Sequence, residues 1–381
     1  MLLKLLIYCL LFFLPTQLGH HFWFDFSYKL GARVDYLSPT IYLTDVIVLL
    51  IIIIFFITKK IRLNGKLVKW LIGLMIFVGT WLLLIKENPI LLFYNLVKLA
   101  EMVLLGLIVA KTVTKRDFPQ VIKVLNLALI IQTALALYQV IVEKSSGLWI
   151  IGERSFSIQT PGIAKFVAIN GLQLLRGYGT FPHPNVLAGF SLVVLVLNIT
   201  MLMWKKPKKL WWISGTALSL SAIFLSFSLL AWGLALFLIV FSLRKIYLYP
   251  LLITNYWLLI TFLTDESVTR RLELLKIAWQ LFKTSPIFGI GLGNFIPKMP
   301  ALSDQVYFWQ PVHNIFALVG VETGIIGLGV LGWLIYKILQ KKSILYTLCF
   351  IILVTGLFDH YWLTLQQGRL LLAIIIGLSL I

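Results

Sequence analysis

The chain consists largely of apolar stretches of about 20 residues, the length of a helix that crosses a bilayer. Lipid offers backbone amides and carbonyls no hydrogen-bond partner, so a spanning segment must form a helix or join a closed barrel. Hydrophobic residues make up 60% of the sequence and charged residues only 12%. We therefore expect an all-α polytopic membrane protein, organised as a single membrane domain over residues 1–381.

The positive charges lie in short connections between the apolar stretches. They cluster at residues 59–66, 111–116, 205–209, 244–245 and 341–342. Cytoplasmic loops of membrane proteins carry an excess of lysine and arginine, which accounts for most of the formal net charge of +19. The charge therefore requires no nucleic-acid partner, and it places these connections in the cytoplasm.

Counting the apolar stretches between the basic clusters predicts about twelve transmembrane helices, with both termini in the cytoplasm. Residues 210–243 would form one helix roughly 51 Å long, which is too long for a single span, so we expect a turn near Ser226–Ser228. The predicted helices are 2–18, 41–58, 67–85, 90–110, 119–142, 185–204, 210–226, 229–243, 246–263, 312–336, 343–358 and 369–381.

The first apolar stretch follows Lys4 and also fits the pattern of a signal peptide. No small-residue cleavage site follows it, so we expect a retained helix. The sequence contains no GxxxxGK, HExxH or CxxC element and therefore no recognisable motif for ATP or a metal ion. We expect no cofactor.

Two connections, residues 143–184 and 264–311, are much longer than a link between helices requires. Both are rich in tryptophan, phenylalanine, glycine and isoleucine, unlike disordered segments. The charge pattern makes both extracytoplasmic. We expect them to form a cap over the outer end of the helices.

The second long connection contains a predicted interfacial helix at Ser267–Ser285. Arg271 falls on its apolar face with Leu275, Ala278 and Phe282. An unpaired guanidinium in an apolar interface is costly, so Arg271 requires an anionic partner. A phospholipid head group and a substrate phosphate both qualify, and we favour the substrate.

Gly289, Gly291 and Gly293 alternate in the segment after this helix. Glycine allows close backbone approach, and exposed amides in such a segment can hold an anion. Gly291 and Gly293 are therefore candidates for substrate binding, although a packing turn explains the same pattern.

His313 lies at the start of the predicted helix 312–336. It shares a helical stripe with Gly320, Gly324 and Gly327, and small residues mark the face that packs on other helices. The positive end of the helix dipole favours a neutral imidazole and attracts phosphate. We therefore interpret His313 as a general base, with an ordinary interfacial histidine as the alternative. Glu322 lies about half a turn round the helix and is not expected to orient it.

Further polar residues gather at the predicted outer ends of the helices. Arg154 and Glu153 in the first long connection are expected to extend a polar rim there. The last external turn contributes Asp359, His360, Gln366, Gln367 and Arg369.

Two other groups of charged residues have open interpretations. Lys98 and Glu101 are spaced to form an ion pair inside the membrane, in either a structural or a functional role. His20-His21 and Asp25 could bind a metal, but the neighbouring aromatic residues indicate contact with the membrane surface, so we predict no metal site.

These motifs together make the chain resemble the O-antigen ligase and polymerase superfamily of bacterial membrane glycosyltransferases. The resemblance extends over residues 140–335 and depends on three segments. They are Arg176–Asn185 (RGYGTFPHPN), Arg271 followed by Ser285–Phe295 (SPIFGIGLGNF), and His313-Asn314 leading into Glu322–Gly327 (ETGIIG).

The resemblance implies a GT-C-like fold in the bacterial inner membrane, with the active site on the extracytoplasmic face. It implies transfer of a glycan from an undecaprenyl-diphosphate-linked donor to a hydroxyl of a glycan, lipid or protein acceptor, without a metal. Arg176 and Arg271 would hold the diphosphate, and His313 would deprotonate or orient the acceptor. The candidate substrate-binding residues are His183, Asn185, Asn314, Arg154, Gly291, Gly293 and Arg369.

The chain departs from this pattern at Ser228-Leu229, where many members carry a Ser-Arg pair. Arg154 or Arg369 would then have to supply the missing charge. A polysaccharide-repeat polymerase of the same superfamily, a lipid-linked glycan transporter and a catalytically silent scaffold remain alternatives. We find no internal repeat of the kind that transporters often carry.

Overall fold

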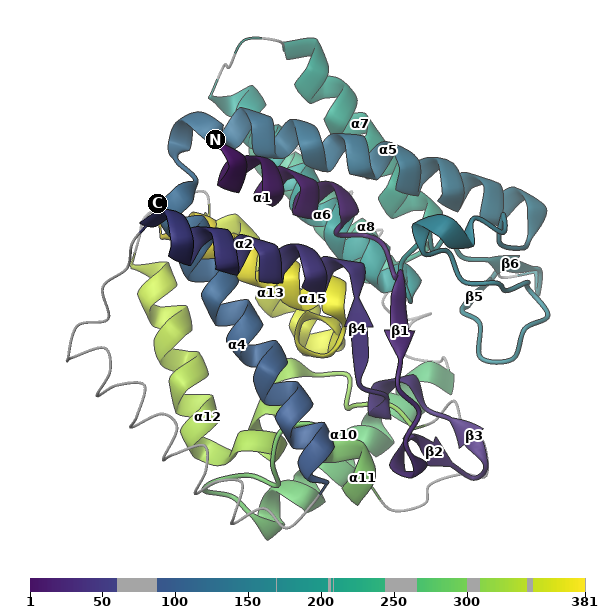
Figure 1. The fold of residues 1–381 in the computed structure, drawn as a ribbon. Coiled ribbons are helices and arrows are strands. Elements are labelled where there is room, and N and C mark those ends of the chain that lie inside the picture. The colour runs from purple at the N-terminus through teal and green to yellow at the C-terminus, as the bar shows by residue number, and fades with distance from the viewer. Residues whose placement is uncertain are drawn as a thin grey trace.

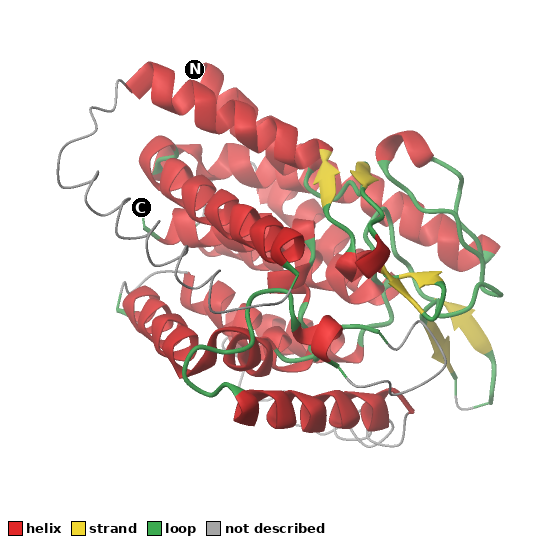
Figure 2. Ribbon diagram, turned by 60° about the horizontal axis from the view of Figure 1, so that its bottom comes forward, coloured by secondary structure: helices red, strands yellow, loops and turns green. Residues whose placement is uncertain are grey.

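The computed structural model describes residues 1–59, 88–168, 170–204, 207, 209–243, 266–299, 309–340 and 345–380. Helices dominate these residues, and the few short strands lie to one side of them (Figures 1 and 2). The helices of ten or more residues are α1 (Leu2–Phe13), α2 (Leu43–Lys59), α4 (Pro89–Thr112), α5 (Phe118–Val142), α6 (Pro184–Met203), α7 (Lys209–Leu225), α8 (Leu229–Leu243), α10 (Glu266–Thr284), α12 (Ile315–Leu339), α13 (Leu345–Phe358) and α15 (Gln366–Ser379).

The remaining elements are short. Helices α11 (Phe295–Lys298) and α14 (Tyr361–Thr364) have one turn each. The strands pair as antiparallel hairpins: β1 (Gly19–His21) with β4 (Thr40–Tyr42), β2 (Tyr28–Lys29) with β3 (Ala32–Arg33), and β5 (Lys165–Val167) with β6 (Gln173–Leu175).

Most of the predicted helices that fall on described residues agree with the structure within a few residues. The predicted turn is present, because Phe227 has a φ of 47° and separates α7 from α8. The predicted helices 67–85 and 246–263 lie outside the described residues.

Two of the helix boundaries that differ from the prediction have a clear local cause. Helix α1 ends at Phe13 rather than at residue 18, because Pro15 has no amide hydrogen to donate to the helix. Helix α12 begins at Ile315 rather than at residue 312, because the side chain of Asn314 accepts a hydrogen bond from the amide of Ala317 and caps the helix. His313 therefore precedes the helix instead of lying in its first turn.

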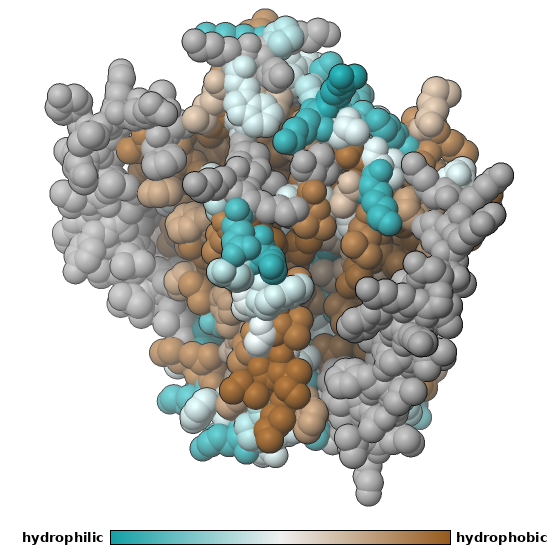
Figure 3. All heavy atoms as spheres, turned by 90° about the vertical axis from the view of Figure 1, so that its left-hand side faces the viewer, coloured by the Kyte–Doolittle hydropathy of each residue, from teal (hydrophilic) through white to brown (hydrophobic). Residues whose placement is uncertain are grey.

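Both faces of the long helices are apolar, as expected for helices between protein and lipid. On α2, Ile47, Val48 and Ile51 are buried, whereas Leu49 and Ile57 are exposed. Apolar side chains also cover much of the described surface in Figure 3. Within the described part of the chain, four helices (α4, α5, α6 and α12) are long and apolar enough to cross a membrane, and six shorter apolar helices accompany them. The chain is a helical, multi-pass membrane protein.

Helix α6 is the central helix of the main core, and most of its side chains are buried. A pair of buried amides joins it to α5. Asn126 Nδ2 donates to Asn198 Oδ1 at 3.0 Å, and Asn198 Nδ2 donates to Asn126 Oδ1 at 2.8 Å. Because both amides are satisfied without water, they fix how α5 and α6 pack in an apolar surrounding.

A second apolar cluster lies beside the main core. It combines Val34 and Leu37 from the segment before β4, Leu274 and Ala278 from α10, and Val321 from α12. Segments far apart in the sequence thus meet next to Val312 and the adjoining His313. The hairpins β1–β4 and β5–β6 lie at the side of the molecule away from the two chain termini in Figure 1.

Helix α12 is kinked at Gly324, where the segment after α10 packs against it. Gly324 has φ 66° and ψ −165°, a region that only glycine adopts readily. The amide of Ile325 donates to the carbonyl of Pro286 at 2.8 Å. A Cβ on Gly324 would lie 2.1 Å from the carbonyl oxygen of Ile287. The kink therefore holds α10 and α12 together.

Replacing Gly324 with alanine should destabilise the protein by about 1–3 kcal/mol through backbone strain, with a further loss from the clash with Ile287. The measurement is the thermal unfolding midpoint of the purified protein in detergent. Gly329→Ala is the control, since a Cβ there meets nothing within 4 Å and alanine favours a helix. Equal midpoints for the two variants would contradict this account of the kink.

Candidate functional site

Two glutamines of α5 fix the segment Gly177–Thr180. Gln139 Oε1 accepts from the amides of Tyr178 and Gly179 at 2.8 and 2.9 Å, and its Nε2 donates to the carbonyl of Gly179 at 2.8 Å. Gln132 Oε1 accepts from the amide of Thr180 at 2.7 Å. These buried bonds hold the backbone between Arg176 and His183, and so determine where both side chains lie.

Gly179 is required at this place. Its φ is 61°, and a Cβ would lie 2.4 Å from Gln132 Oε1. Glu153 supports the same region, because its carboxylate accepts hydrogen bonds from Gln139 Nε2 and from the amides of Ser146 and Leu148. Glu153, which the sequence placed on a polar rim, is therefore a buried structural residue.

A chain of polar contacts runs from Arg176 to Asp359. Arg176 Nε donates to the carbonyl of Ser226 at 2.8 Å, and its Nη2 donates to Asn185 Oδ1 at 2.7 Å. Asn185 Nδ2 in turn donates to Asp359 Oδ2 at 2.9 Å. Residues 174 positions apart are thereby joined, and the amide of Asn185 fixes the distance between the guanidinium and the carboxylate.

Asp359 continues the chain to His313. Its Oδ1 accepts from the amide of His360 at 2.8 Å and lies 3.7 Å from His313 Nδ1, an ion-pair distance that is too long for a hydrogen bond. The rings of His313 and His360 have centroids 4.8 Å apart, and Tyr36 meets His360 edge-on at 5.4 Å. The carboxylate that faces His313 is thus Asp359, and Glu322 was correctly set aside.

His183 and His313 each lie just before a long helix, α6 and α12. His183 caps α6, and its Nδ1 accepts from the amide of Asn185 at 3.1 Å, so the ring carries its proton on Nε2. Two helix N-termini, with their positive ends, therefore converge on the site. This arrangement favours an anion between them.

Burial and neighbouring charges control the ionisation of these groups. Burial, followed by the charge of Arg176, lowers the pKa of His183 to about 3. Burial, followed by His313, lowers the pKa of His360 to about 3. Burial alone would raise the pKa of Asp359, but His313 and then His360 hold it well below its ordinary value. At neutral pH the site contains a carboxylate and two uncharged imidazoles.

Arg271 reaches this region from α10. The side chains of Leu274, Ile277 and Ala278 are buried on the inner face of α10, and Arg271 lies one turn before Leu274 on that face. Its positive charge contributes to the lowered pKa of both His183 and His360. Leu275, which was predicted on the same face as Arg271, is 42% exposed.

Of the remaining candidate side chains, Asn314 and Arg154 contact residues next to this group, whereas Arg369 does not. Asn314 caps α12 and donates from Nδ2 to the carbonyl of Leu357 at 3.2 Å. Arg154 donates to the carbonyl of Pro182 at 2.7 Å, next to His183, and lies 3.9 Å from Asp35. Arg369 instead faces α4, where its Nη2 donates to Asn95 Oδ1 at 3.0 Å.

Gly291 and Gly293 contact protein groups in this structure. The amide of Gly291 donates to the carbonyl of Glu322 at 2.9 Å. A Cβ on Gly293 would lie 2.2 Å from Asn95 Nδ2. The hydrogen bond to the residue of α12 accounts for the amide of Gly291, and close packing on α4 accounts for Gly293, which favours the alternative interpretation. Their role in substrate binding stays a prediction.

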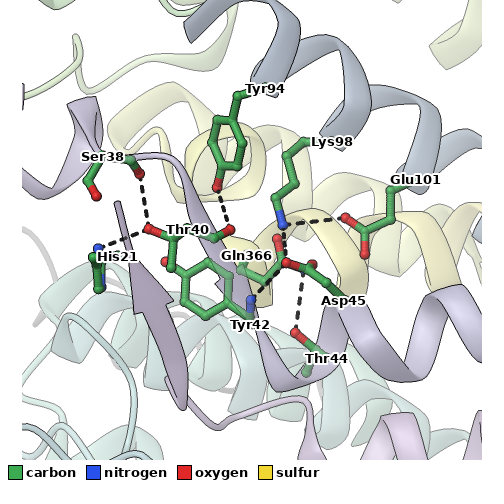
Figure 4. Close-up of polar contacts among 10 residues, drawn as sticks. All are labelled: His21, Ser38, Thr40, Tyr42, Thr44, Asp45, Tyr94, Lys98, Glu101 and Gln366. Carbon is green, nitrogen blue, oxygen red and sulfur yellow. Dashed lines mark hydrogen bonds and ion pairs between the residues drawn. The ribbon is translucent and has the colours of Figure 1, made fainter. Parts of the chain in front are cut away.

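A buried charge cluster joins α2, α4 and α15 (Figure 4). Lys98 Nζ lies 2.5 Å from Asp45 Oδ2 and 3.6 Å from Glu101 Oε2, and Gln366 also donates to Asp45. The predicted pair of Lys98 and Glu101 is confirmed, but Asp45 is the closer partner. The members of the cluster come from three helices and form ion pairs and hydrogen bonds with one another. A structural role, the joining of these helices, therefore accounts for the buried charge of Lys98.

Sequence reasoning placed Asp359 and His360 only on a polar rim and gave Tyr36 no role. The signal for Asp359 and His360 was an acid and an imidazole directly after an apolar helix. At the amino-terminal segment, His21 Nδ1 bonds Thr40 Oγ1 at 2.9 Å and its ring stacks on Trp23. His21 is thereby accounted for by packing.

The described site thus combines guanidinium groups, neutral imidazoles, a buried carboxylate and two helix N-termini at one end of a membrane bundle. Such a set can bind an anionic group and accept a proton from a hydroxyl. These features suit a membrane protein whose site could hold an anionic group at one end of its helices.

Residues 186–334 match the family model described as O-antigen ligase. The match confirms the resemblance to the O-antigen ligase superfamily, whose members are glycosyltransferases of ligase or polymerase type. It includes Arg271 and His313 but begins after Arg176, His183 and Asn185, and ends before Asp359. No curated protein matches the chain.

Replacing Gln139 with leucine should destabilise the segment that carries Arg176. The amides of Tyr178 and Gly179 and the carboxylate of Glu153 would lose a partner, at about 1–3 kcal/mol for each unsatisfied group. Thermal unfolding in detergent measures the loss. Gln120→Leu makes the same change at an exposed position of α5 and should leave the midpoint unchanged. A Gln139→Leu protein as stable as wild type would refute the anchoring role.

Proposed function

We propose that the protein transfers a glycan from an undecaprenyl-diphosphate-linked donor to an acceptor hydroxyl, in the manner of an O-antigen ligase. The single observation that carries this proposal is the continuous set of contacts from Arg176 through Asn185 and Asp359 to His313, with Arg271 nearby. It puts phosphate-binding cations beside a proton acceptor.

Arg176 and Arg271 hold the diphosphate in this proposal. Guanidinium groups bind phosphate oxygens through paired hydrogen bonds, and the N-termini of α6 and α12 add positive potential. The Nε2 proton of His183 provides a further donor. Since diphosphate is the leaving group, these groups stabilise the negative charge that grows on it during transfer.

His313 acts as the general base. Its imidazole takes the proton of the acceptor hydroxyl while the new bond forms between that oxygen and the anomeric carbon of the donor sugar. The bond between the anomeric carbon and the phosphate oxygen breaks, and undecaprenyl diphosphate leaves with the electron pair. The imidazolium that results is stabilised by the negative charge of Asp359, whose Oδ1 lies 3.7 Å from His313 Nδ1. The reaction balances without a metal ion.

The reaction takes place on the extracytoplasmic face of the bacterial inner membrane. The site lies at the N-terminal ends of α6 and α12, whereas basic clusters follow the C-terminal ends of these helices, at residues 205–209 and 341–342. Basic connections favour the cytoplasm, which supports an external site. The long connections 143–184 and 264–311 would then cap the bundle from outside.

The test is glycan transfer by purified protein, supplied with a lipid-diphosphate-linked oligosaccharide and candidate acceptors. His313→Ala should lower the rate roughly 10²–10⁴-fold, which is the usual contribution of a general base. Arg176→Ala should also abolish most transfer. Arg176→Lys should retain only part of the wild-type rate, because lysine cannot hydrogen-bond Ser226 and Asn185 at once.

His20→Ala removes an exposed imidazole from β1 and serves as the control. Undiminished transfer by His313→Ala would exclude it as the base. Products that lengthen the donor glycan would indicate a polymerase, and carrier movement across vesicles without covalent transfer would indicate a transporter.

A further inference from the structure

Two buried imidazole nitrogens at the site have no hydrogen-bond partner among the residues that the structure describes: His313 Nδ1 and His360 Nε2. An unsatisfied buried polar atom is costly, and proteins seldom leave one without a purpose. Both nitrogens face the carboxylate of Asp359. One ligand atom from each of the three residues lies within 4.8 Å of the others.

The hydrogen bonds of His360 allow the tautomer whose lone pair lies on the nitrogen that faces the other two residues. In that tautomer Thr364 Oγ1 donates its single proton to the carbonyl of His360 at 3.1 Å. The same oxygen, 2.7 Å from His360 Nδ1, accepts the proton of that nitrogen. The lone pair is left on Nε2, which is buried and faces the other two residues.

The surroundings of this triad resemble those of metal ligands. A metal-binding histidine usually donates its other ring proton to an oxygen atom, as His360 does to Thr364. A metal-binding carboxylate is usually held by hydrogen bonds, as Asp359 is by Asn185 and by the amide of His360. His360 is 2% and Asp359 7% exposed, so both are well shielded from water.

We propose that His313, Asp359 and His360 form a binding site for a divalent transition-metal ion such as Zn²⁺, and that the bound ion inhibits the enzyme. Two imidazoles and one carboxylate are a common ligand set for such ions. Their nitrogens and oxygens bind zinc at about 2.0–2.2 Å, so the three side chains need to draw together slightly from their present separation.

Inhibition follows from the identity of one ligand, and this part of the proposal rests on the proposed function. A metal ion on His313 Nδ1 draws electron density from the ring and separates the imidazole from Asp359. His313 then no longer serves as a base. Arg176 and Arg271 lie near the triad, and their positive charges repel a bound cation. This repulsion weakens metal binding, so a chelator should remove the ion readily.

The binding test uses the full-length protein in detergent, with any affinity tag removed and metal stripped by a chelator. Zn²⁺ is titrated in competition with a chromophoric chelator. Wild type should bind one ion per chain, His360→Ala should bind at least tenfold more weakly, and the His20→Ala control should match wild type. Absence of stoichiometric binding, or equal binding by His360→Ala, would overturn the site.

A second measurement needs no variant. Co²⁺ added to the wild-type protein should give visible absorption bands of a low-coordinate ion with nitrogen ligands, and Zn²⁺ should abolish them by displacement. A spectrum of hydrated Co²⁺ alone would also overturn the site.

The inhibition test adds Zn²⁺ to the transfer assay. At saturation, transfer should fall at least tenfold and return after chelation. Stoichiometric binding together with full activity would refute the inhibitory role. A protein that binds the ion but transfers no glycan under metal-free conditions would count against the proposed function, whereas the site itself would stand.

Discussion

The buried carboxylate of Asp359 is the interaction on which the site depends. An isolated charge in an apolar surrounding is unfavourable, so Asp359 needs partners from more than one element. Asn185 at the start of α6, the amide of His360 and the imidazole of His313 supply them. Because each partner belongs to a different segment, satisfying one charge draws three parts of the chain together. The position of Arg176 follows through Asn185.

The membrane helices followed closely from the sequence, because length and apolar character alone decide whether a segment spans lipid. Their ends were less certain. Helix α1 ends before Pro15, and α12 begins only after the capping side chain of Asn314. Local backbone chemistry rather than hydrophobicity therefore sets these boundaries. The turn at Phe227 was predictable because a charge-free stretch between two basic clusters was too long for one span.

The site was predictable only in part. Arg176, His183 and His313 stood out as cations and imidazoles at the start of apolar segments. Asp359 gave no comparable signal, since its partner Asn185 is 174 residues away and only tertiary structure brings them together. The glycines allowed both an anion cradle and tight packing, because a small residue suits either. Only the positions of Asn95 and the carbonyl of Glu322 distinguish the two.

The bend at Gly324 has a consequence for how the site is supported. It joins α10 to α12, so Arg271 comes from a helix that is fixed to the helix that His313 precedes. Arg176 and Asn185 come from a different part of the fold, where Gln139 and Gln132 hold the segment between Arg176 and His183 against α5. The contacts of Asp359 with Asn185 and with His313 are where these two separately supported parts of the chain meet.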